Sequence, residues 1–348
     1  MDIAATIKGL KRLCAHEHPE DIVWIDENPW VVDALRGSLH EMAWRGTLTE
    51  YFYKNPLHVN HLSKRAITRL EHLEGRLTET DSDDSILCDC EIGLGTYGWK
   101  YDPAVIHRAM NSGIRLIDTA ETYGYGRVEE ALGKALRNNP RTIGDDYPIL
   151  ATKVARTHLS HNSIIKAADR SIGRLEHKID LYQVHRPNPK YPLHGIVEAL
   201  RLLHSRGSIG AIGVCNFSVD QLMDIQYEMY PARLSSVQVR YSLVDRGMER
   251  ALLHYCQSIG LSVIAYSPLG QKFPKAMSIG MPALTVVAKN YGATEAQIAL
   301  AWLMSWERVI PIPRTNNVDH VNEITESVQL DLSDDDICFL DDAFPITE

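Results

Sequence analysis

The 348-residue chain is 45% hydrophobic and 23% charged, which is typical of a globular protein with a full core. Its formal net charge of -9 argues against broad attraction to nucleic acid or to an anionic membrane. No apolar run reaches the roughly 18 residues of a membrane helix, and the N-terminus lacks the features of a secretory signal. The six cysteines show no pairing or metal-ligand pattern, so we expect a reduced, cytoplasmic protein without a metal site.

Residues 1–85 are expected to form a separate, mainly helical extension. Apolar residues recur at helical spacing over Trp30–Trp44 and Leu62–Leu77, where tryptophans are expected to face a core. The polar stretch Thr78–Ser85 has the composition of a linker. Acidic side chains such as Glu71 lie among the basic ones of this extension, which favours a solvated helix face over a nucleic-acid contact. A protein partner or a second copy of the chain could dock here, and the sequence leaves the role of the extension open.

Residues 86–348 are expected to form a second domain, in which short β-branched runs alternate with helical segments such as Met248–Ser258. Gly113, Gly260 and Gly292 fit left-handed positions at helix ends. Each parallel connection needs a crossover, so eight strand–helix units over roughly 250 residues predict an α/β fold, the (β/α)₈ TIM barrel. The expected strands are Glu91–Tyr97, Arg115–Ala120, Ile149–Val154, Asp180–His185, Ile209–Asn216, Ser235–Ser242, Leu261–Ser267 and Val309–Arg314.

The first of these strands carries a glycine motif, Gly93–Gly98, that matches the G-x-G-x-x-G dinucleotide fingerprint, with Asp118 at the expected distance beyond it. Two features argue against a Rossmann unit. The preceding Cys88–Glu91 is too polar for a doubly buried central strand. The following helix begins at Asp102, whose negative charge opposes a phosphate at that helix end.

Four polar residues follow the early strands instead. Asp118, Lys153 and His185 each close a strand, and Tyr123 lies in the loop after the first of them. Each alone has an ordinary structural interpretation, such as a cap or a solvated charge. Because active sites of TIM barrels lie at the carboxyl ends of the strands, three successive strands would bring these residues to one rim.

The four side chains suit carbonyl reduction. The developing alkoxide needs a proton, and a tyrosine with an ordinary pKa of about 10 is a poor donor at neutral pH. A nearby ammonium such as Lys153 would lower that pKa, and a carboxylate such as Asp118 would hold the lysine charged. A histidine such as His185 could orient the carbonyl.

These motifs resemble a known family. Asp118-Thr-Ala-Glu-Thr-Tyr123-Gly, Thr152-Lys153 and Gln183-Val-His185 are similar to the Asp-Tyr-Lys-His tetrad of the aldo-keto reductases, over about residues 90–345. The resemblance implies that Tyr123 is the general acid, that Lys153 tunes it, that Asp118 pairs with Lys153, and that His185 positions the substrate.

The resemblance also implies a nicotinamide site. Gly213-Val-Cys215-Asn216-Phe217 resembles the family's Gly-Val-Ser-Asn-Phe segment, in which Ser and Asn hold the carboxamide. A cysteine replaces the serine here, so one hydrogen bond would be weaker. Gln238 matches the other carboxamide partner, and Tyr266 matches the aromatic residue that stacks on the nicotinamide ring. The remaining residues expected near the cofactor are Gly95, Thr96, Tyr97, Asp118, Ser267 and Leu269.

The last strand and its loop resemble the family's adenosine-phosphate grip. Arg314, Thr315 and Asn316 stand where the family has a Lys-Ser-Asn type of run, and Glu323 matches the acidic residue near the adenine. His320 replaces an arginine that usually contacts the 2′-phosphate. Arg314 can bind phosphate bidentately, so the resemblance favours NADPH and leaves NADH open.

The resemblance implies that the substrate is a small carbonyl compound, but the sequence does not identify it further. Trp99 and Tyr125 are expected to line an aromatic pocket, and Arg186 would favour an anionic substrate. A rival interpretation is a cofactor-bound regulatory subunit that senses redox state and docks a partner through residues 1–85. The intact tetrad favours catalysis.

Overall fold

The computed structural model describes residues 86–139, 147–230, 232–271, 273, 275 and 280–346. The expectations for the extension, including its helices and its partner, lie outside the described residues. The larger of the chain's two compact units comprises residues 85–217, 225–250 and 261–348. None of the helices among the described residues combines the length and the apolar character that a membrane span requires.

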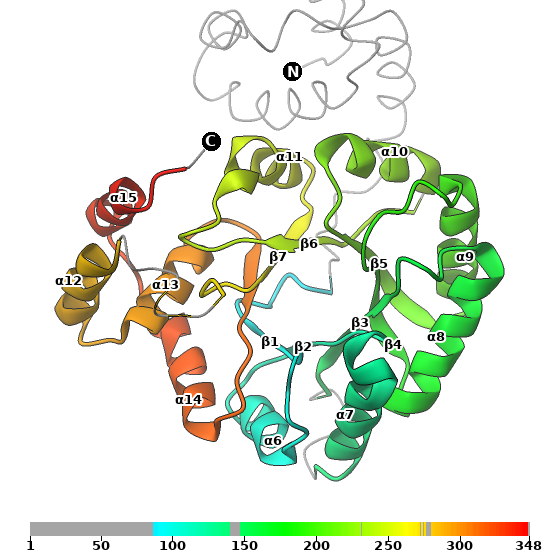
Figure 1. Cartoon of the computed structure of the whole chain (residues 1–348), viewed down its shortest axis with the longest axis horizontal. Helices are drawn as coiled ribbons and strands as arrows, with labels where there is room; N and C mark the ends of the chain where they lie inside the picture. Colours follow the sequence, from blue (N-terminus) through cyan, green and yellow to red (C-terminus); the bar gives the residue numbers. More distant parts are fainter. Residues whose placement is uncertain are drawn as a thin grey trace, which may run out of the picture. The chain divides into compact units, whose positions relative to one another are not determined.

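Eight parallel strands follow one another around a barrel in chain order (Figure 1). The ring closes between the last strand and the first, where the Gly95 N–H donates to the Pro313 carbonyl at 2.9 Å. The expected (β/α)₈ barrel is therefore confirmed. The strands are β1 (Gly93–Gly95), β2 (Leu116–Asp118), β3 (Ile149–Val154), β4 (Ile179–Val184), β5 (Ile209–Cys215), β6 (Ser236–Arg240), β7 (Ser262–Tyr266) and β8 (Val309–Ile312).

Helices surround the strands in Figure 1. Gly113, Gly260 and Gly292 have φ of 90°, 67° and 62°, so the glycines expected at left-handed positions adopt them. The α-helices are α6 (Pro103–Asn111), α7 (Arg127–Arg137), α8 (His161–Leu175), α9 (Leu193–Ser205), α10 (Val219–Met229), α11 (Leu252–Ser258), α12 (Met281–Tyr291), α13 (Glu295–Met304), α14 (Val318–Glu326) and α15 (Asp334–Ala343). The 3₁₀ turns whose bounds lie among the described residues are η2 (Tyr123–Gly126), η3 (Gly247–Arg250) and η5 (Ser327–Gln329).

The helix expected over Met248–Ser258 is divided into η3 and α11, and the intervening Ala251 has a non-helical backbone at φ -148°. The Glu249 carboxylate in η3 is buried and accepts hydrogen bonds from the Arg246 guanidinium at 2.8 Å and the Tyr241 hydroxyl at 2.9 Å. These side-chain bonds hold η3 in place before α11 begins.

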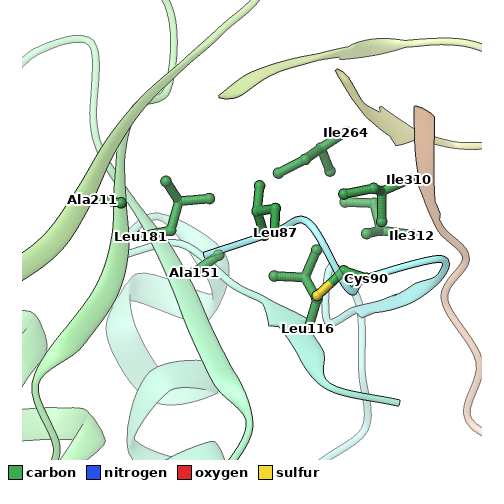
Figure 2. Close-up of a cluster of buried hydrophobic side chains, with 9 residues drawn as sticks. All are labelled: Leu87, Cys90, Leu116, Ala151, Leu181, Ala211, Ile264, Ile310 and Ile312. Atoms are coloured by element: carbon green, nitrogen blue, oxygen red, sulfur yellow. The ribbon is translucent and has the colours of Figure 1, made fainter. Parts of the chain in front are cut away.

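The strand expected over Glu91–Tyr97 is shorter at both ends, and the residues before it close one end of the barrel. Leu87 and Cys90 are buried, whereas Cys88 and Asp89 between them are exposed. Figure 2 shows Leu87 among the apolar side chains at the start of the strands. This cluster, called here the barrel floor, comprises Leu87, Cys90, Leu116, Ala151, Leu181, Ala211, Ile264, Ile310 and Ile312.

The glycines of β1 serve packing. A Cβ on Gly93 would lie 2.9 Å from the Ile312 side chain, and one on Gly95 would lie 3.0 Å from the Ile312 carbonyl oxygen. Both distances are shorter than ordinary carbon contacts, so β1 needs glycine to approach β8. The side chain of Asp102 caps α6 by accepting from the Ala104 N–H at 3.0 Å. The G-x-G-x-x-G match thus lies on a barrel strand, as the sequence indicated.

Candidate active site

A layer of polar side chains lies toward the carboxyl ends of the strands, beyond the barrel floor. Asp118, Lys153, Gln183 and Gln238 come from β2, β3, β4 and β6, and all four are buried. Lys153 and Gln183 are partners in register, two residues beyond the floor pair Ala151 and Leu181. Because side chains alternate along a strand, residues two positions apart point to the same side. The strands therefore carry an apolar layer and then a polar one.

Lys153 occupies the centre of this polar layer. Its Nζ donates to Asp118 Oδ2 at 2.6 Å and to the Thr119 carbonyl at 2.8 Å. It also lies 3.3 Å from the Tyr123 hydroxyl. A fully buried ammonium needs such partners, since an unpaired one would be costly. The structure thus brings together three of the four residues expected to act in catalysis.

Tyr123 begins η2, five residues after β2 ends at Asp118. Gly124 and Tyr125 have left-handed backbones at φ 56° and 58°, which turn the chain sharply at this point. The Lys153 Nζ lies 5.1 Å from the Tyr123 ring centroid, and the Tyr97 ring meets Tyr123 edge-on at 5.2 Å.

Two opposing effects set the pKa of Tyr123. Burial raises it, and attraction by Lys153 lowers it, but burial is the larger effect and the net pKa is raised. The expected lowering by Lys153 is therefore present without being dominant. For Lys153, burial lowers the pKa, but the attraction of Asp118 and Tyr123 exceeds this and raises it. The ammonium consequently stays charged beside a protonated phenol at neutral pH.

His185 follows β4 and lies beside Tyr123, with the ring centroids 5.9 Å apart. Its Nδ1 is 3.4 Å from the Thr122 hydroxyl. Burial, with the charges of Lys153 and Arg186, lowers the pKa of His185 to about 4. A neutral imidazole can orient a carbonyl by hydrogen bonding but holds no surplus proton at neutral pH.

The loop that carries Tyr123 is tied to β3 by Glu121, a residue that the sequence analysis did not single out. Its Oε1 accepts from the Ala155 N–H at 2.7 Å and lies 2.9 Å from His158 Nδ1. Its Oε2 lies 3.5 Å from Arg170. A single carboxylate in a loop forms no sequence pattern, so these interactions could not be predicted from the sequence.

Asp118 also receives two amides. Its Oδ1 accepts from Gln238 Nε2 at 2.7 Å and from Gln183 Nε2 at 3.3 Å. Cys215 is buried, and its thiol donates to Gln183 Oε1 at 3.4 Å. The part of Gln183 was not predicted, although a glutamine beside apolar residues in an inner strand, two residues before His185, is a usable signal.

Asn216 and Tyr266 lie together at the ends of β5 and β7. The Tyr266 hydroxyl donates to Asn216 Oδ1 at 2.8 Å, and Asn216 Nδ2 donates to the His185 carbonyl at 3.1 Å. Asn216 has a left-handed backbone at φ 60°, a conformation that asparagine tolerates better than most residues. Tyr266 is partly exposed, so its ring remains open to a planar partner.

The residues after β8 differ in what they can offer a phosphate. Asn316 joins two loops, since its Oδ1 accepts from the Lys100 N–H at 2.8 Å and its Nδ2 donates to the Gly98 carbonyl at 3.4 Å. The Thr315 hydroxyl accepts from the Asn317 N–H at 2.9 Å. Arg314 and His320 are exposed, and neither forms an ion pair among the described residues. Glu323, Ser267 and Leu269 are partly buried.

Of the residues expected to line the substrate pocket, Tyr125 is 93% exposed and Trp99 only 4%. The Trp99 indole N–H is buried without a hydrogen-bond partner among the described residues. Arg186 is exposed next to His185. Tyr97, expected on the cofactor side, is 71% exposed and adjoins Tyr123. Tyr97 is thus placed to contact a molecule that reaches the Tyr123 hydroxyl.

The residues present fit a nicotinamide dinucleotide by the chemistry of their donor set. The partly exposed Tyr266 ring offers stacking, and the exposed guanidinium of Arg314 offers a phosphate contact. The Gln238 amino group is bound to Asp118, so its amide oxygen remains as an acceptor for a carboxamide N–H. Among the described residues no group of His, Cys, Asp or Glu side chains could hold a metal ion.

Comparison with known proteins identifies a family. Residues 91–343 match the aldo/keto reductase family. The chain belongs to that family. The expected resemblance, and with it the oxidoreductase class, is confirmed.

Two relatives and one solved structure show how far the similarity extends. Aldo-keto reductase YhdN of Bacillus subtilis is 36% identical over 51% of this chain and 58% of its own length. Methylglyoxal reductase YeaE of Escherichia coli is 29% identical over 71% of this chain and 85% of its own length. An aldo-keto reductase from Klebsiella pneumoniae, crystallised with NADPH, is 29% identical with a TM-score of 0.67 over 74% of this chain and 92% of its own. These relatives carry reductase names and give no support to the regulatory alternative.

Proposed function

We propose that this aldo-keto reductase reduces an aldehyde or ketone to an alcohol, with NADPH as the hydride donor and Tyr123 as the proton donor. The observation that carries the proposal is the position of Lys153 Nζ, which is 2.6 Å from Asp118 Oδ2 and 3.3 Å from the Tyr123 hydroxyl. Tyr123 in turn lies beside the neutral His185 ring.

Each side chain has one part in the proposed reaction. The substrate carbonyl oxygen accepts hydrogen bonds from the Tyr123 hydroxyl and the His185 imidazole. As negative charge develops on that oxygen, the phenol proton moves to it, and the nearby Lys153 ammonium stabilises the resulting phenolate. Asp118 keeps Lys153 charged and in place. When bound, NADPH supplies the hydride to the carbonyl carbon.

The chain's own residues would hold the dinucleotide at three points. Gln238 and Asn216 would contact the carboxamide, and Tyr266 would stack on the ring. Arg314 and His320, both exposed, would contact the adenosine phosphate. A Klebsiella pneumoniae relative in complex with NADPH supports NADPH as the cofactor to test first.

The proposed substrate is a small carbonyl compound that reaches the Tyr123 hydroxyl beside Tyr97. Arg186 lies at the same rim and would favour compounds with a negative charge. One relative is named a methylglyoxal reductase, so methylglyoxal belongs in the carbonyl panel together with neutral and anionic aldehydes and ketones.

Fluorescence titration with NADPH and, separately, with NADH tests the cofactor site. We expect saturable binding of NADPH and weaker binding of NADH, because Arg314 offers a bidentate phosphate contact. Arg314→Ala should weaken NADPH binding more than NADH binding. Binding of neither dinucleotide by the folded protein would refute the proposed cofactor site.

A further inference from the structure

The Asp118 carboxylate is held by side chains from three strands, and the proposed function gives a role to two of them, Lys153 and Gln238, but none to Gln183. Lys153 from β3 binds Oδ2, whereas Gln238 from β6 and Gln183 from β4 bind Oδ1. Removing any one of these donors would cost the buried Asp118 carboxylate a charge-assisted hydrogen bond. The direction of the carboxylate therefore depends on the amides as well as on the lysine.

The orientation of the Gln183 amide is itself fixed. An ionised carboxylate only accepts hydrogen bonds, so the amino group of Gln183 must face Asp118. The amide oxygen then faces two donors, the Cys215 thiol and the Gln238 amino group, each at 3.4 Å. Cys215 thus acts on Gln183, and through it on Asp118.

The neighbouring strand leaves room for this side chain. Gly213 of β5 is the register partner of Gln183. A Cβ on Gly213 would lie 3.0 Å from Gln183 Cγ and 2.5 Å from Ser236 Oγ. Any larger residue at position 213 would displace Gln183, so the two positions form a matched pair.

We propose that Gln183 is a positioning residue, which fixes the Asp118 carboxylate so that Lys153 Nζ stays beside the Tyr123 hydroxyl. The inference rests on the proposed role of Tyr123 as the acid. Without the Gln183 donor, the carboxylate can turn and draw Nζ from its place 3.3 Å from the phenol oxygen. Proton transfer would slow, whereas cofactor binding would be little changed.

Two substitutions separate this role from simple packing. Gln183→Met keeps an unbranched chain of similar volume and removes the donor at every pH. Gln183→Glu keeps the shape, and its carboxyl group can donate to Asp118 only while it is protonated. The pKa of the introduced carboxyl should exceed the ordinary value of about 4.3, because the group is buried and faces Asp118.

Other groups around the position should not titrate between about pH 5.5 and pH 8. Burial raises the pKa of Tyr123 and of Cys215. The pKa of Lys153 is raised by Asp118 and that of His185 is lowered to about 4 by burial. A new pH dependence in this range would thus report the introduced carboxyl.

The test measures kcat from about pH 5.5 to pH 8 and the Kd for NADPH in the full chain. Gln183→Met should lower kcat by about tenfold at all pH values, as expected for one hydrogen bond to a charged group. Gln183→Glu should approach the wild-type kcat at the acid end and lose it as pH rises. Tyr182→Phe is the matched control, because Tyr182 is a buried neighbour on β4 whose hydroxyl lacks a partner among the described residues. It should match wild type throughout.

The inference would be overturned if Gln183→Glu had the same fraction of the wild-type kcat at about pH 5.5 as at about pH 8. A wild-type kcat in Gln183→Met would also overturn it. If Gln183→Glu does not fold, Gln183→Met decides, since a loss in kcat with unchanged Kd for NADPH supports positioning and an unchanged kcat contradicts it. A wild-type protein without NADPH-dependent turnover would instead refute the proposed function itself.

Discussion

Asp118 and Lys153 illustrate at the scale of single residues how stability and chemistry depend on the same contact. The two charges are 3% and 0% exposed and lie 2.6 Å apart. Removing one member of a buried pair leaves the other uncompensated and costs about 3–5 kcal/mol. Lys153→Met should therefore lower both the melting temperature and the activity.

The double substitution Asp118→Asn with Lys153→Met separates the two effects. It removes both buried charges, so the melting temperature should recover toward wild type, measured by thermal unfolding. Activity should stay low, because no ammonium remains beside Tyr123. Recovery of turnover in the double variant would show that the ion pair serves stability alone.

His185 predicts an acid sensitivity. Its pKa falls from 6.5 to about 4 on folding, so the unfolded chain binds more protons between these values. This contribution to stability is complete above about pH 6.5 and is lost as pH falls toward 4. Urea unfolding at about pH 7 and pH 4.5 should show a smaller loss of stability in His185→Gln than in wild type. Equal losses in the two proteins would mean that folding does not lower the pKa of His185.

At the scale of elements, the short segment before β1 closes the barrel floor. Leu87 is 2% exposed and packs in the floor cluster with Leu181 and Ile264 (Figure 2). Leu87→Ala should lower the free energy of unfolding by about 2–5 kcal/mol, with kcat unchanged at a temperature where the variant is folded. Cys88→Ala, at an exposed neighbour, is the control and should unfold like wild type. An unchanged stability of Leu87→Ala would show that this segment does not close the floor.

The positions of the strands could be predicted from the pattern of side chains, but their exact ends were harder to predict. Ile149–Val154 matches the structure at both ends. The strand expected over Arg115–Ala120 ends at Asp118, although the N–H groups of Thr119 and Glu121 still donate to carbonyls of β3. Such cross-strand bonds depend on the neighbouring strand, which lies some thirty residues away in the sequence and is not visible in a local pattern.

The proximity of the proposed catalytic residues was predictable, because Asp118, Lys153 and His185 lie at strand ends, Tyr123 lies in the loop after one of them, and the barrel brings strand ends together. The partners of these residues were not. Gln183 binds Asp118 across 65 positions of sequence and Gln238 across 120, and Cys215 binds Gln183 rather than lying open to a carboxamide. Only the register of β4, β5 and β6 decides these contacts.

At the scale of the whole barrel, one end provides apolar packing and the other carries the candidate active site. The floor is apolar and seals the start of the strands, whereas the polar layer above it carries the charges and amides of the site. β2, β3 and β4 each contribute one residue to each layer, as Ala151 and Lys153 do in β3. Substitutions in the floor should therefore act on stability, and those in the polar layer on turnover.

The measurement that tests the central claim most directly is NADPH oxidation with the carbonyl panel by wild type and by Tyr123→Phe. The phenylalanine keeps the ring but lacks the hydroxyl that lies 3.3 Å from Lys153 Nζ. Tyr123→Phe should lose at least about a hundredfold in kcat, the typical contribution of a general acid, and should bind NADPH within about twofold of wild type, since such a difference is below 0.5 kcal/mol. Full turnover by Tyr123→Phe would contradict the assignment of Tyr123 as the acid, even with the barrel and the cofactor site intact.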